Sequence, residues 1–259
     1  PKYPAIRIPK PGDGNMLEIT IADHHFGALV WGRETGGPDY DMGIARGDWQ
    51  DAGSTLIART GHHRFDRVVL VLGNDQSDID NRKGLTERGT AQDTDSRYPK
   101  ICWTSQEISV WTVETLCAVA PVVDVLTVPG NHDYQSTLSL GDYLYAWFRN
   151  SKNVHVNREP TKRKFVEHGK VMLMFEHGDN GKLEDYGKTM AAVQREMWGR
   201  TIVHEAHTGD KHHRRLVEFQ GYAVRILPSL RPPNAWSVEN HYIGALRCAE
   251  AYCWSANEG

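Results

Sequence analysis

The sequence lacks closely spaced cysteine pairs and long apolar runs, and each absence excludes a class of protein. Its four cysteines form no Cys-x-x-Cys pair and are too few to hold 259 residues together by disulfides. We therefore expect a reducing, cytoplasmic compartment. No apolar run approaches the roughly 20 residues that a membrane-spanning helix needs, so we expect no membrane partner.

An excess of charge of one sign is also lacking. The formal net charge of −3 does not indicate strong non-specific binding of nucleic acid, although an acidic chain can still bind it through a local patch. No repeat, low-complexity tract or linker divides the chain, so we expect a single domain over 1–259. The first residues are not those of a secretory signal and include no initiating Met, so we expect a processed or truncated N-terminus.

Histidine is the residue type present in excess, with 13 in the chain, and it is the commonest metal ligand. The most informative one stands in Asn131-His132-Asp133, which follows the apolar run 122–128 after a Pro-Gly pair. An Asn oxygen can bind a hard metal ion, a His can bind metal or move a proton, and an Asp can orient that His. This strand end therefore predicts a metal site or a catalytic site.

Four other predicted strands end in residues of the same kinds. Each is an apolar or alternating segment with Asp or His side chains directly after it. The segments are 16–22, followed by Asp23 and His25; 68–72, followed by Asp75; 170–175, followed by His177; and 201–206, followed by Asp210 and His212.

The order of the other elements predicts the fold class. Helical spacing separates the strands of the first half, whereas the second half is rich in hairpins, which favours an α/β domain with more than one sheet. We expect helices over 44–58, 104–120, 140–148 and 184–198, hairpins from 164–168 with 170–175 and from 216–219 with 223–227, and a long functional loop over 76–100.

In open α/β sheets, sites form beyond the carboxyl ends of the strands, so we expect these Asp, Asn and His side chains to meet. Together they exceed the four to six ligands of one ion. Two divalent ions that share a carboxylate account for the set better, and such a pair suits in-line attack at phosphorus.

The order of these motifs resembles that of the calcineurin-like metallophosphoesterase superfamily, from Leu17 to His213. More narrowly, the segments 75–81, 89–95, 228–230 and 235–236 resemble a phage and bacterial nuclease-like branch. The resemblance implies a four-layer α-β-β-α sandwich of two mixed sheets, with a dinuclear metal site at the C-terminal edge of the strands. Residues 214–259 would form a C-terminal hairpin and an extension of the same domain.

The resemblance also implies a role for each motif residue. One ion would be held by Asp23, His25 and His212, and the other by Asn131 and His177, with Asp75 bridging both. His132 would be the general acid toward the leaving oxygen, with its ring oriented by Asp133 or by Asp78. A metal-bound hydroxide would be the nucleophile. We expect Mn²⁺, with Mg²⁺, Fe²⁺ and Zn²⁺ as alternatives.

The chain departs from the family pattern at two places. Asp210 stands where a histidine ligand of the second metal is expected; it could replace that ligand and favour Mn²⁺ or Mg²⁺, or it could weaken the site, or His207 could reach in instead. Asn74 is inserted between Gly73 and Asp75, where the superfamily has Gly-Asp.

Three basic residues are candidates for substrate binding: Arg97 in the long loop, and Lys211 and Arg214 beside the last motif. The function that the resemblance implies is metal-dependent hydrolysis of phosphodiester bonds, with DNA or RNA as the substrate. A small-molecule phosphatase or a phosphodiesterase for nucleotides or cyclic nucleotides is the first alternative. A metal-binding interaction protein without catalysis is an alternative of another class, but such a protein would have no need of a general acid at His132.

Overall fold

The computed structural model describes residues 9–12 and 14–259. The N-terminal residues for which we predicted processing or truncation lie outside this range. Among the described residues, no helix is both long enough and apolar enough to cross a bilayer.

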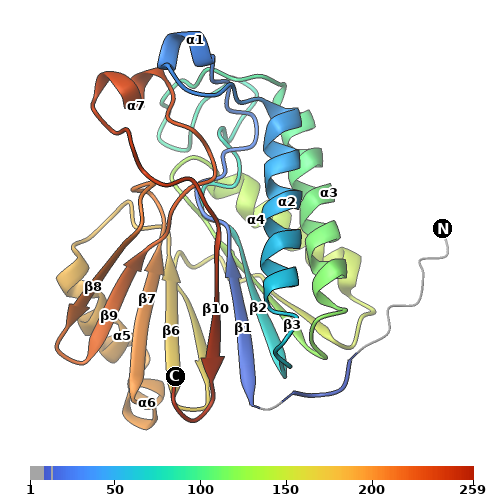
Figure 1. Ribbon diagram of the computed structural model, residues 1–259, viewed down its shortest axis with the longest axis vertical. Coiled ribbons are helices and arrows are strands. Elements are labelled where there is room, and N and C mark those ends of the chain that lie inside the picture. The colour runs from blue at the N-terminus through green and yellow to red at the C-terminus, as the bar shows by residue number, and fades with distance from the viewer. Residues whose placement is uncertain (1–8, 13) are drawn as a thin grey trace.

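The first sheet has five strands in the order β10-β1-β2-β3-β4 (Figure 1). The strands β1 to β4 run parallel, and β10 joins them antiparallel to β1. Their bounds are β1 Asn15–Thr20, β2 Arg67–Gly73, β3 Val123–Val128, β4 Val154–Asn157 and β10 Glu250–Ser255.

The second sheet also has five strands, in the order β5-β6-β7-β9-β8. Its two outer pairs are antiparallel hairpins, whereas β6, β7 and β9 run parallel at the centre. The bounds are β5 Lys164–His168, β6 Val171–Glu176, β7 Val203–Thr208, β8 Arg215–Phe219 and β9 Tyr222–Ile226. Both sheets are therefore mixed, and both predicted hairpins are confirmed.

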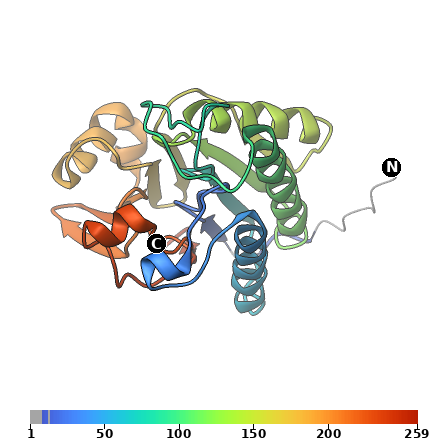
Figure 2. The same cartoon turned by 90° about the horizontal axis from the view of Figure 1, so that it is seen from above.

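Helices cover the outer face of each sheet (Figures 1 and 2). The first sheet carries α2 Met42–Arg59, α3 Tyr98–Leu116 and α4 Tyr134–Phe148. The second carries α5 Tyr186–Val193 and α6 Arg195–Arg200, after the short 3-10 helix η1 Leu183–Asp185. The short helices α1 Gly32–Thr35 and α7 Ala235–Glu239 contact each other above the sheets.

The core follows from the two-residue period of the strands. In β2, Val68 and Leu70 face the helices, whereas Val69 and Val71 pack with Leu173 and the rest of the layer between the sheets. Side chains of β6 alternate in the same way, because Met172 and Met174 face α5. The predicted four-layer α-β-β-α sandwich is confirmed.

Several predicted boundaries were wrong for local reasons. Helix α3 begins at Tyr98, within the segment predicted as loop. Pro99 fits its first turn because proline lacks a backbone N–H, and the N–H groups of a first turn have no partner within the helix. The helix predicted over 184–198 is interrupted at Gln194, whose φ of −121° and ψ of 55° are not helical. Strands β4 and β10 were not predicted.

Candidate dinuclear metal site

The predicted metal ligands lie in turns that leave five strand ends, and these turns are strained. Seven residues other than glycine have positive φ among the described residues, and six of them belong to this region. A backbone conformation of this kind costs of the order of 1–3 kcal/mol of free energy for each residue. It persists where the surrounding structure imposes it, most often at functional sites. The six residues are Asp23, His25, Asn74, Asp75, Asp210 and His212, with φ of 52° to 65°.

Backbone hydrogen bonds lock the turns together. The N–H groups of Asp23 and His25 donate to the carbonyl oxygens of Asn74 and Asp75, over 2.8 and 3.0 Å. The N–H of Asp210, from the second sheet, donates to both carboxylate oxygens of Asp23, over 3.0 and 2.9 Å. The last motif is thereby fixed against the first, although the two are 187 residues apart.

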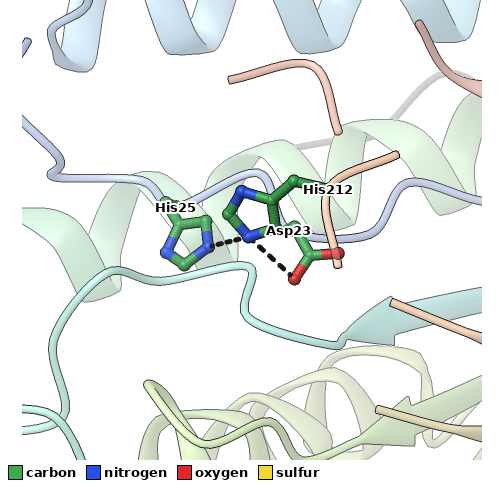
Figure 3. Close-up of side chains that lie close together, drawn as sticks. All are labelled: Asp23, His25 and His212. Atoms are coloured by element: carbon green, nitrogen blue, oxygen red, sulfur yellow. Dashed lines mark hydrogen bonds and ion pairs between the residues drawn. The ribbon is translucent and has the colours of Figure 1, made fainter. Parts of the chain in front are cut away.

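Three side chains form the first cluster (Figure 3). The His212 Nε2 atom lies 3.4 Å from the Asp23 Oδ1 atom and 3.4 Å from the His25 Nε2 atom. The Nδ1 atom of His25 donates to the Asp78 carboxylate over 3.0 Å, so its Nε2 lone pair faces the cluster. The pKa of His25 lies well below its ordinary value, first because the ring is buried and then because Arg231 and neighbouring histidines are positively charged. His25 is therefore neutral, as a metal ligand must be.

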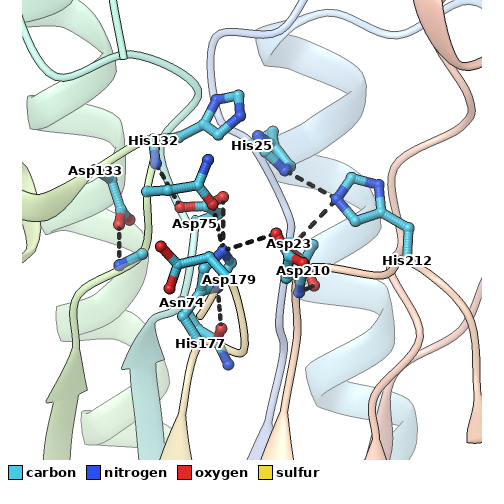
Figure 4. A network of polar contacts seen from close by, with 12 residues as sticks. Asp23, His25, Asn74, Asp75, His132, Asp133, His177, Asp179, Asp210 and His212 are labelled. Atoms are coloured by element: carbon cyan, nitrogen blue, oxygen red, sulfur yellow. Dashed lines mark hydrogen bonds and ion pairs between the residues drawn. The ribbon is translucent and has the colours of Figure 1, made fainter. Parts of the chain in front are cut away.

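The second cluster surrounds His177 (Figure 4). Its Nε2 atom lies 2.7 Å from the Asn131 Oδ1 atom, 3.1 Å from the Asp75 Oδ2 atom and 3.8 Å from the Asp210 Oδ1 atom. Its Nδ1 atom donates to the side-chain oxygen of Asn74 over 2.6 Å. The ring therefore presents Nε2 to Asp75, Asn131 and Asp210, all of which were predicted as ligands.

Asp75 lies between the two clusters. One of its oxygens belongs to a group of potential ligand atoms with His25 and His132, and it also belongs to a group with Asp23 and His177. This position suits the bridging role predicted for it. Asp23 likewise belongs to a group on each side, because it is also grouped with His25 and His212.

The site holds an excess of buried acid. Burial opposes ionisation of Asp75, but the charges of His177 and His132 outweigh it and lower its pKa to about 2. Burial opposes protonation of His177, but Asp75, Asp23 and Asp210 outweigh it and raise its pKa to about 10. Burial, with the Asp75 charge, raises the pKa of Asp133 to about 7. In this metal-free form, the protonated His177 ring therefore provides a positive charge that partly neutralises the neighbouring carboxylates.

His132 stands beside the clusters on the turn after β3 and is partly exposed (Figure 4). Its backbone N–H donates to the Asp75 carboxylate, and its Nδ1 atom donates to the backbone oxygen of Asp78 over 2.8 Å. Because a carbonyl oxygen only accepts, Nδ1 carries a proton and Nε2 is the atom that can exchange one. The Asp78 carboxylate lies 3.6 Å from the same Nδ1 atom. The structure thus places Asp78 against this ring.

The prediction that Asp133 could orient His132 is wrong. The two oxygens of Asp133 accept the backbone N–H groups of Gly130 and Ser77, over 3.0 and 3.3 Å. Asp133 therefore fixes the turn that carries Asn131 and His132, and it does so through the backbone. The proposal that His207 reaches the second cluster is also wrong, because both of its ring nitrogens are bonded to glutamates between the sheets.

The predicted substrate residues have three different settings. Lys211 forms an ion pair with Asp210 and so lies at the edge of the second cluster. Arg214 instead pairs with Glu250 over 2.8 Å, at the start of β10, which leaves its guanidinium engaged on the surface. Arg97 is exposed at the N-terminus of α3.

Two residues at the site were not predicted to act there. Asn74, recognised only as an insertion, holds the His177 ring and accepts the Asp23 N–H. Asp179, two residues after His177 (Figure 4), has a buried side chain, which pairs with Arg88 from the long loop after β2. The position of Asn74 in the motif was a signal, whereas nothing in the local pattern distinguished Asp179.

These residues fit divalent ions. Two donor atoms that each lie about 2.1 Å from one ion stand about 3.0–3.4 Å apart, and both distances in the first cluster match this range. The donors are imidazole nitrogens and carboxylate or amide oxygens, without thiolate, which suits Mn²⁺, Fe²⁺ or Zn²⁺. In addition, Asp78 and Asn74 fix the rings of His25 and His177, as is usual for histidines that bind metal.

Comparisons with known proteins give distant similarities to solved structures. No protein-family model and no curated protein matches the sequence. Solved structures that align with the chain include Vps29 from Entamoeba histolytica in complex with Zn²⁺, at 13% identity and a TM-score of 0.35 over 83% of this chain and 75% of that one. A predicted phosphoesterase from Streptococcus pneumoniae aligns at 12% identity and a TM-score of 0.37, over 93% of this chain and 83% of that one.

An archaeal phosphodiesterase aligns at 10% identity and a TM-score of 0.38, over 83% of this chain and 84% of that one. TM-scores below 0.5 carry no argument about function.

Proposed function

We propose that the chain is a metal-dependent phosphoesterase that hydrolyses phosphodiester bonds and that its substrate is DNA or RNA. The observation that carries the proposal is the convergence of five strand ends, from both sheets, on two adjoining sets of ligand atoms with His132 beside them. Two ions bound there, for which we propose Mn²⁺, would activate water and neutralise the charge that develops on phosphoryl oxygens.

The residues of the chain have separable roles in this proposal. Asp23, His25 and His212 would hold one ion, Asn131, His177 and Asp210 the other, and Asp75 both. His132 would donate a proton from Nε2 to the leaving oxygen, because its Nδ1 is committed to the Asp78 carbonyl. Burial of the Asp23 and Asp75 carboxylates lowers the local dielectric and strengthens their attraction for cations.

The choice of a polymer substrate rests on the resemblance of four segments to a nuclease-like branch. The same site chemistry would serve a small-molecule phosphatase or a nucleotide phosphodiesterase. A non-catalytic metal-binding protein would share the ligands, but it would have no use for a histidine whose proton-exchanging nitrogen is left free beside them.

A substrate panel tests the proposal. The Mn²⁺-loaded protein is assayed against a generic phosphodiester, a generic phosphomonoester, single- and double-stranded DNA, RNA and cyclic nucleotides, together with elemental analysis of bound metal. We expect cleavage of the generic diester and of at least one nucleic acid, and two ions per chain. Asp75→Asn, which suits the positive φ of this position, serves as the inactive control. Exclusive cleavage of the monoester would overturn the nuclease assignment. No hydrolysis of any substrate would favour the alternative of a non-catalytic metal-binding protein.

A further inference from the structure

A buried arginine lies in a segment that is fixed to the candidate metal site. Arg231, in the segment after β9, is only 8% exposed, and its Nε atom is buried with no hydrogen-bond partner among the described residues. Arginine is almost never buried unless its charge is paired, because an unpaired buried donor costs about 1–3 kcal/mol and a charged one more. This arrangement therefore requires an explanation.

The segment that carries Arg231 is fixed to the first cluster. The hydroxyl of Ser229 donates to the backbone oxygen of Asp23 over 2.6 Å and accepts the backbone N–H of Arg231 over 3.0 Å. Two hydrogen bonds thus connect the arginine backbone to a predicted metal ligand, and Ser229 is itself buried. The position of Arg231 is built into the site and is not that of a free surface side chain.

The guanidinium charge acts on two residues of the site. After burial, which is the main cause of the low pKa of His25, the charge of Arg231 is the next cause. Burial raises the pKa of Asp78 to about 6, and the charge of Arg231 is the first influence that opposes this rise. These effects agree with the place of the segment beside the first cluster, which the hydrogen bonds of Ser229 establish.

A structural counter-ion for Asp78 is the plainer explanation for this arginine, but the contacts do not favour it. The Asp78 carboxylate lies 3.0 Å from His25 Nδ1 and 3.6 Å from His132 Nδ1, and within the described residues it forms no ion pair with Arg231. Arg247, by contrast, is paired with Asp48 and donates to the backbone oxygen of Leu230. Of these two arginines near the end of the chain, Arg231 is the one whose Nε donor lacks a hydrogen-bond partner among the described residues.

We propose that Arg231 is the phosphate-binding residue of this site and that its guanidinium binds the non-bridging oxygens of the substrate's phosphoryl group. The inference rests on the proposed function for the identity of that group. A guanidinium offers a planar fork of donors that matches two oxygens of a phosphate, and such charge-assisted bonds strengthen where water is excluded. A bound phosphoryl group would supply the anionic acceptor that the Nε atom of Arg231 lacks among the described residues.

The test measures binding of inorganic phosphate by calorimetry to the Mn²⁺-loaded protein, at concentrations that do not precipitate the metal. The variants are Arg231→Met, which removes the charge, Arg231→Lys, which retains it without the fork, and Arg247→Met as the matched control. We expect the Kd for phosphate to be roughly 10- to 100-fold higher in Arg231→Met, and to rise less in Arg231→Lys. We expect the control to match the wild type, and all variants to retain the wild-type metal content.

Unchanged phosphate affinity in Arg231→Met would overturn the inference, as would failure of the wild type to bind phosphate. If Arg231→Met does not fold, the decision passes to Arg231→Lys, where an unchanged Kd would equally overturn it. The two proposals fail separately. If phosphate binding depends on Arg231 but the wild type does not cleave the diester, only the proposed function is refuted. If the wild type cleaves the diester but phosphate affinity does not depend on Arg231, only the inference is refuted.

Discussion

At the scale of single residues, the site is organised by oxygens that hold the Nδ1 atoms of three of its histidines. The Asp78 carboxylate holds His25, the side-chain oxygen of Asn74 holds His177, and the backbone oxygen of Asp78 holds His132. In each ring this leaves Nε2 as the atom that faces the cluster or the solvent beside it. The three rings therefore present the same nitrogen, Nε2, but we assign them different tasks. His25 and His177 are buried among the carboxylates as proposed ligands, whereas His132 is partly exposed and is the proposed acid.

Replacing His132 tests its separation from the ligands. We expect His132→Ala to retain two ions per chain and to lower kcat about 10²- to 10⁴-fold, because the variant loses a proton donor and no ligand. Turnover of a generic phosphodiester and elemental analysis measure the two effects, and His62→Ala, at an exposed position, is the control. Loss of metal from His132→Ala would show that this ring is a ligand, as its place in one group of potential ligand atoms allows.

Replacing Asp210 tests the departure from the family pattern. Asp210→Asn suits the positive φ of this position and retains the N–H that Asp23 accepts, but it removes the charge 3.8 Å from His177. We expect the affinity for the second ion to fall roughly 10- to 100-fold, so that dialysed protein retains one ion instead of two. Elemental analysis measures the ratio, with Asp185→Asn on the surface as the control. Two ions retained in Asp210→Asn would exclude Asp210 as a ligand.

At the scale of elements, the turns after β2 and β3 pack so tightly that one side chain must be absent. A Cβ atom at Gly130 would lie 1.9 Å from the Asp75 Oδ1 atom and 2.7 Å from the Asp75 backbone nitrogen. The carboxylate that we propose as the bridge can therefore occupy its position only beside a glycine. A Cβ atom at Gly209 would likewise lie 2.6 Å from the Asp23 carboxylate.

We expect Gly130→Ala to displace Asp75, to weaken binding of both ions and to destabilise the fold by about 1–3 kcal/mol, as overpacking does. Metal titration and denaturant unfolding measure these effects. The control is Gly47→Ala in α2, where a Cβ atom meets nothing within 4 Å, and which we expect to stabilise the protein by about 0.5–1 kcal/mol. Wild-type metal affinity in Gly130→Ala would mean that the turns can separate without loss of the bridge.

The sequence predicted the elements that carry a strong local pattern and missed those that depend on distant partners. The apolar runs of β1, β2, β3 and β6 are visible without any partner, and so are the polar residues that end them. Strand β10 is as long as β1, but its pairing with β1 joins residues that are 230 to 240 positions apart. The burial of Arg231 was equally unpredictable, because arginine is exposed by default and only the tertiary structure encloses this one.

At the scale of the whole molecule, the sheets are connected by a buried charge network as well as by apolar packing. His207 of β7 donates to Glu18 of β1 over 2.6 Å and to Glu205 over 2.9 Å. Arg225 and Trp254 donate to the same two glutamates. Burial opposes protonation of His207, but the two glutamates outweigh it and raise its pKa to about 9.

Stability is therefore expected to depend on pH through His207. Its pKa is about 9 in the folded protein and about 6.5 in the unfolded chain, so its contribution is complete below pH 6.5 and is lost as the pH rises through 9. We expect the free energy of unfolding to fall over this window, with a His207 contribution on the order of 2–3 kcal/mol.

Denaturant unfolding at pH 6, 7.5 and 9 measures this loss in the wild type and in His207→Gln, both with chelator present. The variant retains a polar side chain but cannot titrate, so its curve should be flatter. Because His177 also titrates in the metal-free protein, only the difference between the two curves reports on His207. Parallel curves would mean that the network does not depend on protonation of this ring.

The placement of β10 has a consequence for how the chain reaches this structure. A chain made from its N-terminus has β1 and β2 early, but β1 gains its second neighbour only when residues 250–255 arrive, bringing the Trp254 that bonds to Glu18. Until then, the backbone N–H and C=O groups along one edge of β1 are unpaired and can pair with a strand of another chain. The layer between the sheets also stays open at that side, and late closure of this kind makes folding slow and favours association with other chains. Substitutions in β10 should therefore reduce the yield of folded protein more than the site's affinity for metal.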